Sequence, residues 1–403
     1  MKRNVLFFNW GCYPKKPGGE SEAKFSQYRL MKDAYQEKSL GLSDLWEEVE
    51  KTRALLAQLI GIPDHLDHIM FTTGTFDGLF IYLTYLTESG RLNREEEILT
   101  TNLEFPNLYR QLKSARDFKL RVVDCFTHKS ASEITESIIN ACDESTKLAI
   151  LSHVTYTGLL LPLEEICREL KRKNPRIIIL SDGAQALGQV IVDLSRMLVD
   201  AYVADFHKWI QSPTGSGFLY VRDSVQFEEV AARSTCPLQI SPRMFDALRS
   251  GDPFDSDSIS GFNFPETAVA QYRLALFLTR DYQEEIGNSN RRLSLLLRGA
   301  IEDIAHRLRE RISYHPCGEE GVMTGILSIT SYSEYLYNNL KDSVMCRFFP
   351  EIRHMVDLPP ILRIMTSSLP GYNKTEEVFT LCRYIEKAIS KLIDKKSSNQ
   401  PII

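Results

Sequence analysis

Short apolar runs alternate with longer amphipathic segments through the first two-thirds of the chain. Seven of these runs predict buried strands, at residues 68–71, 97–100, 120–123, 148–151, 177–180, 201–204 and 217–221. Between them, apolar side chains recur at helical spacing, as in residues 45–60 and in the segment that starts at TTGTFDG. Strands that alternate with helices are typical of a parallel sheet covered by helices. The pattern therefore predicts an α/β fold.

The pattern changes after a segment rich in Pro, Ser and Asp at residues 250–265, which predicts a domain boundary. Helical periodicity follows it, and then come two predicted strands and a closing helix, at residues 325–330, 361–365 and 375–392. We expect a smaller α+β domain in this part of the chain. The predicted division is an N-terminal segment, a large domain and a small C-terminal domain, at residues 1–40, 41–265 and 266–403.

The composition is that of a soluble globular protein. The chain has 403 residues, of which 43% are hydrophobic, enough for two or three domains with a large core. Its net charge of -5 predicts no nucleic-acid surface, and it contains no run of ~18 apolar residues that would span a membrane. The eight cysteines form no CxxC pair, which argues against a zinc site or a disulfide framework. Asn9 and Trp10 interrupt the first apolar run too early for a signal peptide, so we expect a cytoplasmic protein.

Three polar residues follow two neighbouring predicted strands. Asp182 and Gln185 come shortly after the strand at 177–180, and Lys208 follows the strand at 201–204. Groups at the carboxyl ends of strands in an open α/β sheet face the ligand crevice, so these side chains could converge on one molecule. A pyridoxal phosphate site requires a lysine for the Schiff base and a carboxylate that keeps the pyridine nitrogen protonated. The three residues therefore favour such a site.

A lysine after an apolar run is more commonly a solvated strand end. Two features next to Lys208 argue against this alternative. His207 and Trp209 flank the lysine, and the glycine-rich turn SPTGSG leads directly into the next apolar strand. Together with Asp182 and Gln185 upstream, these features make the functional interpretation the better one.

The segment at residues 181–221, from SDGAQALG to GSGFLYV, resembles the signature of the class V aminotransferase family, pyridoxal-phosphate enzymes of fold type I. This family includes cysteine desulfurases, kynureninases, isopenicillin-N epimerase-like proteins and aminotransferases. The resemblance implies a three-layer αβα large domain with a mostly parallel seven-stranded sheet. It also implies that Lys208 forms the Schiff base, that Asp182 partners the pyridine nitrogen and that Gln185 donates to the phenolic oxygen of the cofactor.

The segment TTGTFDG, at residues 72–78, follows a predicted strand and opens a predicted helix. A helix N-terminus presents free backbone amides, which makes it an anion site, although an ordinary capped helix start has the same appearance. Gly74 permits close approach, Thr75 offers a hydroxyl and Phe76 offers its backbone amide. With the lysine motif elsewhere in the chain, this segment is predicted to bind the cofactor phosphate, with help from His207.

Three positions depart from the family pattern at the predicted phosphate site. Phe76, Asp205 and Phe262 stand where relatives place side chains that hold the phosphate. A carboxylate at position 205 would repel a phosphate dianion unless it is neutralised or turned away. We therefore expect altered cofactor retention, unless other groups compensate, namely Ser260, Thr75, His207 and backbone amides.

Three further residues are predicted to lie beside the cofactor ring. The segment LEFPNLY resembles the family block that stacks a ring on the pyridine, which makes Phe105 the candidate. The segment SHVTYTGLLLP resembles a block beside the cofactor, where His153 would touch ring substituents and Tyr156 would lie near the phenolic oxygen or the substrate. For Phe105 a core position is an equal alternative, and for His153 a structural role is slightly favoured.

The two ends of the chain predict a substrate site. FFNWGCYPKKP resembles the N-terminal block of isopenicillin-N epimerase-like members, which nominates Asn9, Trp10 and Tyr13. ILRIMTSSLPGYNKTEEV resembles the family block whose arginine holds the substrate carboxylate. Arg363 is therefore the predicted clamp, a role that suits guanidinium geometry, and a surface ion pair is the alternative.

The resemblance implies a pyridoxal-phosphate-dependent enzyme that acts on an α-amino acid or an amino-acid conjugate and forms a homodimer. Aminotransferase is the nominal expectation, and the alternatives are epimerisation or cleavage of a C–S or C–C bond. A persulfide-forming desulfurase is disfavoured, because Cys346 is the only cysteine near the arginine block and belongs to a predicted strand, VMCRF. From another class, a binding protein with a decayed phosphate site is an alternative. A dinucleotide-binding protein is disfavoured because no GxGxxG follows an early strand.

Overall fold

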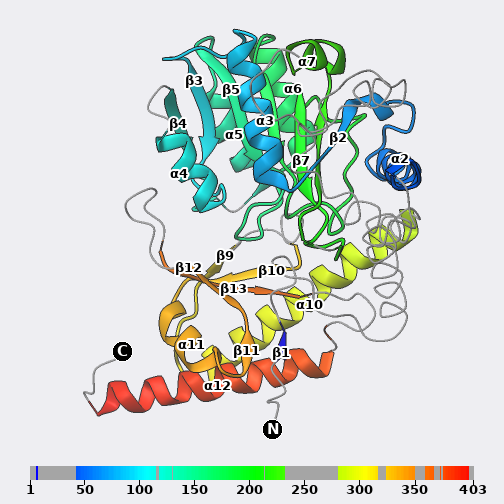
Figure 1. Ribbon diagram of the computed structural model, residues 1–403. Coiled ribbons are helices and arrows are strands. Elements are labelled where there is room, and N and C mark those ends of the chain that lie inside the picture. Colours follow the sequence, from blue (N-terminus) through cyan, green and yellow to red (C-terminus); the bar gives the residue numbers. More distant parts are fainter. Residues whose placement is uncertain are drawn as a thin grey trace.

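The computed structural model describes residues 6–7, 42–114, 118–128, 130–212, 214–231, 280–315, 324–349, 359–366, 373 and 375–398. Two main sheets of different size lie within these ranges, each with its own helices (Figure 1). The seven-stranded sheet and its helices form the large domain, and the four-stranded sheet belongs to the small domain.

The large sheet contains β2 (Ile69–Thr72), β3 (Glu97–Thr101), β4 (Lys119–Val123), β5 (Thr146–Ser152), β6 (Ile178–Asp182), β7 (Ala201–Asp205) and β8 (Gly217–Val221). Their order across the sheet is β2-β8-β7-β6-β5-β3-β4. Strands β3 to β7 pair in parallel with one another, whereas β8 runs antiparallel to both of its neighbours, β7 and β2. The predicted seven-stranded, mostly parallel sheet is therefore confirmed, and each strand lies within two residues of its predicted position.

Helices cover both faces of this sheet (Figure 1). One face is covered by α3 (Thr75–Glu88), α4 (Pro106–Ser114) and α7 (Ser224–Ala231), and the other by α2 (Leu42–Leu59), α5 (Ala131–Ala141) and α6 (Leu163–Lys173). Successive strand residues point to opposite faces, so in β5 Leu148 and Ile150 join the first core while Ala149 and Leu151 join the second. The sheet thus separates two apolar layers, which confirms the three-layer αβα arrangement.

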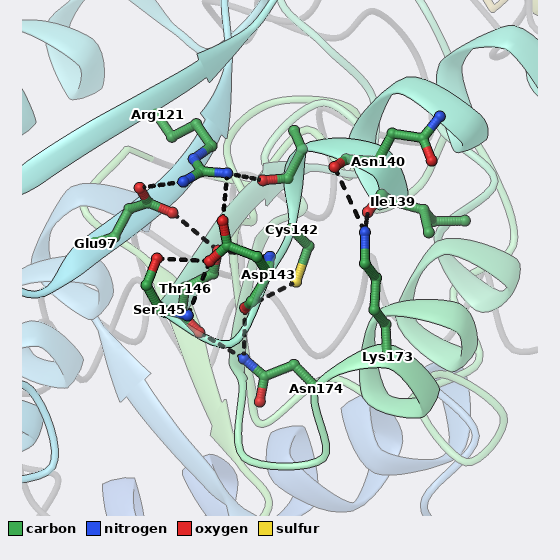
Figure 2. Close-up of polar contacts among 11 residues, drawn as sticks. Glu97, Arg121, Ile139, Asn140, Cys142, Asp143, Ser145, Thr146, Lys173 and Asn174 are labelled. Carbon is green, nitrogen blue, oxygen red and sulfur yellow. Dashed lines mark hydrogen bonds and ion pairs between the residues drawn. The ribbon is translucent and has the colours of Figure 1, made fainter.

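A polar network holds the end of the sheet at which β3 and β5 begin (Figure 2). The Arg121 guanidinium on β4 forms ion pairs with Glu97 at 2.7 Å and with Asp143 at 2.8 Å. At the end of α6, Lys173 donates to the carbonyl of Ile139, near the end of α5, at 2.8 Å. A cation at a helix C-terminus stabilises the unpaired carbonyl groups there. This network lies opposite to the carboxyl ends of the strands.

The small domain is built on an antiparallel sheet. It contains β9 (Tyr314–His315), β10 (Ile326–Ile329), β12 (Arg347–Phe349) and β13 (Ile361–Met365) in the order β12-β13-β10-β9. A separate core joins this sheet to α10 (Arg280–Arg307), α11 (Ser333–Leu340) and α12 (Thr375–Ser397). The predicted α+β character is confirmed, although β9 was too short for the hydrophobic pattern to indicate. The predicted strand VMCRF is two short strands, β11 (Val344–Met345) and β12, with Cys346 between them.

A short strand near the chain start, β1 (Leu6–Phe7), pairs in parallel with β11 and so lies beside the small domain. The predicted boundary at 250–265 and most of the N-terminal segment lie outside the described residues. None of the helices in the described ranges is long and apolar enough to cross a membrane.

The two domains meet where a loop after β5 lies against the small sheet. Gly158 in this loop has a φ of +102°, and a Cβ there would stand 2.5 Å from the carbonyl oxygen of Ile326, so only glycine fits. Three donors of the small domain reach three consecutive carbonyl oxygens: Arg363 to Tyr156 (3.1 Å), Ser328 to Thr157 (3.0 Å) and Thr324 to Gly158 (2.9 Å). We call these three hydrogen bonds between the two domains the carbonyl seam.

Candidate active site

Two aspartates end adjacent strands of the large sheet. Asp182 is the last residue of β6 and Asp205 the last residue of β7, and the two strands run parallel with Asp182 in register with Val203. Both strands are buried along their whole length, which explains the apolar runs that precede the two acids. The carboxyl ends of parallel strands meet at one edge of a sheet, so both carboxylates and the loop that carries Lys208 share this edge.

Asp182 is a buried carboxylate with a raised pKa. Its Oδ1 accepts a hydrogen bond from the amide of Ala184 at 2.8 Å. Burial raises its pKa to about 6, while the charge of Lys208 acts in the opposite direction. A buried carboxylate is stabilised by a cation beside it. The side chain therefore fits the partner of a protonated pyridine nitrogen, the role that the resemblance implies.

Trp209 fixes the orientation of the Gln185 amide. The indole N–H of Trp209 can only donate, and it lies 2.9 Å from Oε1 of Gln185. The NH₂ end of the amide therefore points away from the indole. Both side chains are buried. This orientation fits the role of Gln185 as a donor to a phenolic oxygen, a role that stays a prediction.

Lys208 forms an ion pair with Asp205. Its Nζ lies 2.7 Å from Asp205 Oδ2, and the exposed fractions of the two side chains are 19% and 6%. The other carboxylate oxygen, Oδ1, accepts a hydrogen bond from the amide of Thr75 at 2.7 Å. Thr75 is the first residue of α3. Asp205 therefore supplies the negative charge that a helix N-terminus attracts.

Asp205 is charged although it is buried. Burial raises its pKa, but Lys208, His207 and the Thr75 amide together outweigh this effect and lower the pKa to about 2. A carboxylate at this position avoids repelling a phosphate if it is neutralised or turned away. In the structure the charge of Asp205 is neutralised. Lys208 balances the charge, while the carboxylate still points at the N-terminus of α3.

Two polar groups at the same position have no hydrogen-bond partner within the described part of the chain. Thr75 Oγ1 is buried in a residue that is 4% exposed. His207 Nδ1 is also buried and lies 3.9 Å from Asp205 Oδ1. Burial lowers the pKa of His207, and Asp205 opposes that shift. Buried polar groups without partners are uncommon, so both groups fit the contacts of a bound anion.

The residues at this edge fit pyridoxal phosphate better at one end than at the other. Asp182, Gln185 and Lys208 suit the pyridine nitrogen, the phenolic oxygen and the aldehyde of the cofactor. At the phosphate end, the amide and the hydroxyl of Thr75 suit an anion, but Asp205 already places a carboxylate there.

Phe105 lies in a group of aromatic rings between α3 and the small sheet. Its ring centroid is 6.0 Å from that of Phe76, and 6.5 Å from those of Tyr156 and Phe349, which it meets edge-on. The residue is partly exposed, so the core does not enclose its ring. Partial exposure favours the stacking role over a core position, and the stacking itself stays a prediction.

His153 is held by Tyr202. Its Nδ1 lies 3.0 Å from the Tyr202 hydroxyl, and burial lowers its pKa to about 4, so the ring is neutral at pH 7. The backbone amide of His153 donates to the carbonyl of Asp182 at 2.8 Å. His153 also lines a cavity of about 660 Å³ between α6 and α10, of which Lys208 is not part. These contacts favour a structural role beside Asp182, and a cofactor contact of His153 stays a prediction.

Arg363 is buried at the domain interface. It lies on β13 with 1% of its surface exposed, and its Nη1 donates to the carbonyl of Tyr156. Its guanidinium carbon lies 4.8 Å from the ring centroid of Phe349. Burial excludes the alternative of a surface ion pair. A buried guanidinium that lies against an aromatic ring fits a site for a carboxylate.

Tyr156 carries a buried hydroxyl that has no hydrogen-bond partner among the described residues. Burial raises its pKa well above the usual value, so the group is protonated. Tyr156→Phe is expected to stabilise the substrate-free protein by up to about 1 kcal/mol, because it removes an unsatisfied buried group, and to weaken substrate binding roughly tenfold. Thermal unfolding and KM check both effects. A loss of stability with an unchanged KM would show instead that the hydroxyl is structural.

Glu104 is a buried acid that the sequence patterns do not single out. It is 2% exposed, and its carboxylate accepts hydrogen bonds from the Ser152 amide (3.1 Å), the Ser152 hydroxyl (2.5 Å) and the Thr101 hydroxyl (3.0 Å). Ser152 is in register with Asp182 on the next strand. Burial raises the pKa of Glu104 to about 7. The signal that could have indicated it is a charged residue inside the apolar block LEFP.

Glu104→Gln is expected to remove part of the pH dependence of stability. The pKa is about 7 in the folded protein against 4.5 without burial, so the folded state binds more protons between these values. The contribution of Glu104 to stability therefore falls on the order of a few kcal/mol as pH rises from about 5 to about 8, and the stability difference between wild type and Glu104→Gln should change by this amount. Urea unfolding at both pH values measures it, with Glu165→Gln on the exposed face of α6 as a control. The same fall in wild type and Glu104→Gln would contradict the prediction.

Five residues of the predicted sites lie outside the described part of the chain: Asn9, Trp10, Tyr13, Ser260 and Phe262. Their roles stay predictions. Of the others, Lys208, Thr75 and His207 gather around Asp205, and Phe105, Tyr156 and Arg363 gather at the domain interface. Phe349 joins the second group without a signal in the sequence. Phe349 reaches the domain interface because β12 pairs with β13. The same pairing sets Arg347 opposite Arg363.

Known proteins resemble this chain over parts of its sequence. Residues 27–242 match the aminotransferase class V family. A stretch of 127 residues is 41% identical to isopenicillin N epimerase of Streptomyces clavuligerus and covers 31% of this chain and 30% of that protein. A stretch of 218 residues is 28% identical to cysteine desulfurase SufS of Plasmodium vivax and covers 51% of this chain and 36% of that protein. The chain thus spans about a third of the length of these curated relatives.

Solved structures share the fold over nearly the whole chain. The apo structure of cysteine desulfurase from Thermococcus onnurineus NA1 has a TM-score of 0.72 at 18% identity and covers 96% of this chain and 95% of that chain. At this identity the likeness establishes the fold, which is that of fold type I enzymes. The family match, at residues 27–242, covers more than half of the 403 residues. The chain therefore belongs to the aminotransferase class V family, whose cofactor is pyridoxal phosphate.

Proposed function

We propose that this protein removes the α-proton of an amino acid at the carboxyl edge of the large sheet, and that an elimination follows. The observation that supports this most is the place of Lys208, just after β7 and within reach of the charge of the buried Asp182 at the end of the adjacent strand β6. The buried Arg363 at the domain interface adds to it. A base, a partner for an electron-withdrawing ring and a carboxylate clamp are the groups that such a reaction requires.

Each side chain has a distinct role in this proposal. Arg363 binds the substrate carboxylate through charge-assisted hydrogen bonds. Lys208, when neutral, accepts the α-proton at Nζ. Asp182 stabilises the proton on the pyridine nitrogen, and pyridoxal phosphate, when bound, supplies a ring that delocalises the electron pair left at the α-carbon. Phe105 and Tyr156 exclude water from the same region.

Elimination is favoured over sulfur transfer to a protein cysteine because of Cys346. Burial raises the pKa of Cys346 to about 12, and its Sγ contacts the carbonyl oxygen of Val344 at 3.9 Å. A nucleophilic cysteine needs a lowered pKa, which provides the thiolate. Elimination needs no cysteine. The Cα–H and Cβ–S bonds break, the thiol leaves with a proton, and water converts the unsaturated amino acid into an oxo acid and ammonia.

Epimerisation is the second candidate, because a 127-residue stretch is 41% identical to an epimerase. An epimerase returns a proton to the opposite face of the α-carbon. Tyr156 fits the donor, since its hydroxyl is buried, protonated and without a partner in the described residues. Transamination, the nominal expectation from the sequence, shares the first step, so one experiment can separate all three reactions.

Proton exchange at the α-carbon tests the shared step. The protein loaded with pyridoxal phosphate is incubated in D₂O with a panel of amino acids and S-substituted cysteines, and deuterium uptake is measured by mass spectrometry. Oxo acid, ammonia and thiol without an added acceptor identify elimination, and inversion at the α-carbon identifies an epimerase. Product that forms only with an added oxo acid identifies an aminotransferase. Cofactor binding without exchange on any amino acid would refute the proposal and favour a binding protein.

A further inference from the structure

We propose that the Asp205 carboxylate occupies the phosphate position of the cofactor site, so that the protein binds pyridoxal phosphate reversibly and with little preference over pyridoxal. This role of Asp205 rests on the proposed function, because it concerns how the same site takes up its cofactor. It makes Asp205 a specificity-determining residue at a position where the family pattern has Ser or Asn.

One carboxylate bridges a helix N-terminus and a lysine. Oδ1 of Asp205 is 2.7 Å from the amide of Thr75, and Oδ2 is 2.7 Å from Nζ of Lys208. Gly74 allows this approach, because a Cβ at position 74 would stand 2.8 Å from Asp205 Oδ1. Strand pairing also fixes the backbone of Asp205, which is in register with Gly217 of β8. The carboxylate is therefore a built part of the site.

A second observation indicates that a ligand binds at the same place. The buried Thr75 Oγ1 and the buried His207 Nδ1 both lack a hydrogen-bond partner in the ranges that the structure describes. A hydroxyl, an imidazole nitrogen and helix amides are groups that bind phosphate. The site thus retains donors for a phosphate, while Asp205 places a negative charge among them.

The balance of charge decides how this site responds to a phosphate. Burial raises the pKa of Asp205, but Lys208 and His207 outweigh burial and hold the pKa at about 2, so the carboxylate is ionised at neutral pH. A phosphate at the Thr75 amide meets this charge where little water screens it. Lys208 offsets the charge, yet it is also the residue that must leave Asp205 to bind the aldehyde as a neutral amine. Cofactor uptake therefore draws away the cation that balances Asp205.

The test compares the binding of two ligands to two proteins, the wild type and one variant. Pyridoxal phosphate and pyridoxal are titrated into the wild type and into Asp205→Asn, and binding is followed by the absorbance of lysine-bound ligand near ~420 nm. Asparagine keeps the size of the side chain and can accept from the Thr75 amide, but carries no charge. We expect the preference for pyridoxal phosphate over pyridoxal to rise at least about tenfold in the variant, because loss of the Lys208 ion pair affects both aldehydes alike and cancels in this ratio.

Two controls separate this role from general effects. Asp223→Asn removes the same charge at an exposed position after β8 and should leave the preference unchanged. Asp205→Ser replaces the asparagine variant if that variant fails to fold, and the same rise is expected. An equal preference in the wild type and in the Asp205 variants would overturn the proposal.

Inorganic phosphate supplies a readout that needs no aldehyde. It should raise the thermal midpoint of Asp205→Asn and leave that of the wild type unchanged, because a ligand stabilises only the protein that binds it. That shift, without binding of either aldehyde by any variant, would refute the proposed function and support the role of Asp205. Binding of both aldehydes, with the same preference in the wild type and in the Asp205 variants, would refute the role of Asp205 and leave the proposed function standing.

Discussion

Lys208→Ala is expected to abolish the absorbance of lysine-bound pyridoxal phosphate near ~420 nm and to lower turnover by ~10⁴-fold or more. The variant removes two functions at once, because the same Nζ binds the aldehyde and accepts the α-proton in the proposed reaction. It also leaves Asp205 buried without the cation that lies 2.7 Å away in the wild type. Breaking such a pair costs about 3–5 kcal/mol when it is fully buried. That figure is an upper bound, because 19% of the lysine side chain is exposed.

Lys208→Arg separates the covalent chemistry from the electrostatics. Arginine keeps a cation opposite Asp205, but its guanidinium stays protonated and cannot attack an aldehyde. We expect this variant to recover the stability lost in Lys208→Ala and to recover no absorbance band. Lys387→Ala, at an exposed position of α12, controls for the loss of one lysine. An absorbance band in either Lys208 variant would contradict the assignment.

Arg363→Lys is expected to lower kcat/KM for the amino-acid substrate by roughly 10²-fold, about 2–3 kcal/mol. Lysine keeps the charge but lacks the planar fork that binds a carboxylate through two parallel hydrogen bonds. A clamp holds the ground state and the transition state alike, so the loss should lie mostly in KM. Initial rates over a range of substrate concentrations separate KM from kcat.

Arg347 offers a matched control for Arg363. The two residues are opposite each other on β12 and β13, and their guanidinium carbons lie 5.7 Å and 4.8 Å from the ring of Phe349. Arg347, however, is exposed. Arg347→Lys should therefore change KM less than about threefold. Wild type and Arg347→Lys should also prefer an amino acid over its amide, whereas Arg363→Lys should lose this preference. Equal effects of the two substitutions would argue against the clamp.

The large sheet could be predicted from the sequence because each of its strands is a short apolar run with polar residues at its ends. β7 and β8 are buried along their whole length, so nearly every position in them is apolar. In contrast, β9, β11 and β12 contain two or three residues, too few for a periodic pattern. These strands form because of partners that are distant in the sequence.

The residues of the candidate site also divide into those with a local signal in the sequence and those that depend on distant partners. Lys208 and Asp182 have a local signal, since each is a polar residue just after an apolar run. For Glu104 the local signal, a charged residue inside the apolar block LEFP, does not show where the carboxylate binds, because its partner Ser152 lies 48 positions along the chain. The sequence also indicated the charge of Asp205 but not where the carboxylate points. That direction depends on Thr75, 130 positions earlier.

The acceptors of the carbonyl seam are backbone oxygens, so substitution of Tyr156 or Thr157 would leave them in place. Gly158 is the exception, because the carbonyl of Ile326 leaves no room for a Cβ. The large domain can therefore change these side chains while its hydrogen bonds to the small domain persist. In a lineage whose members include epimerases and desulfurases, such a carbonyl seam would let new specificities evolve without the two domains having to be refitted to each other.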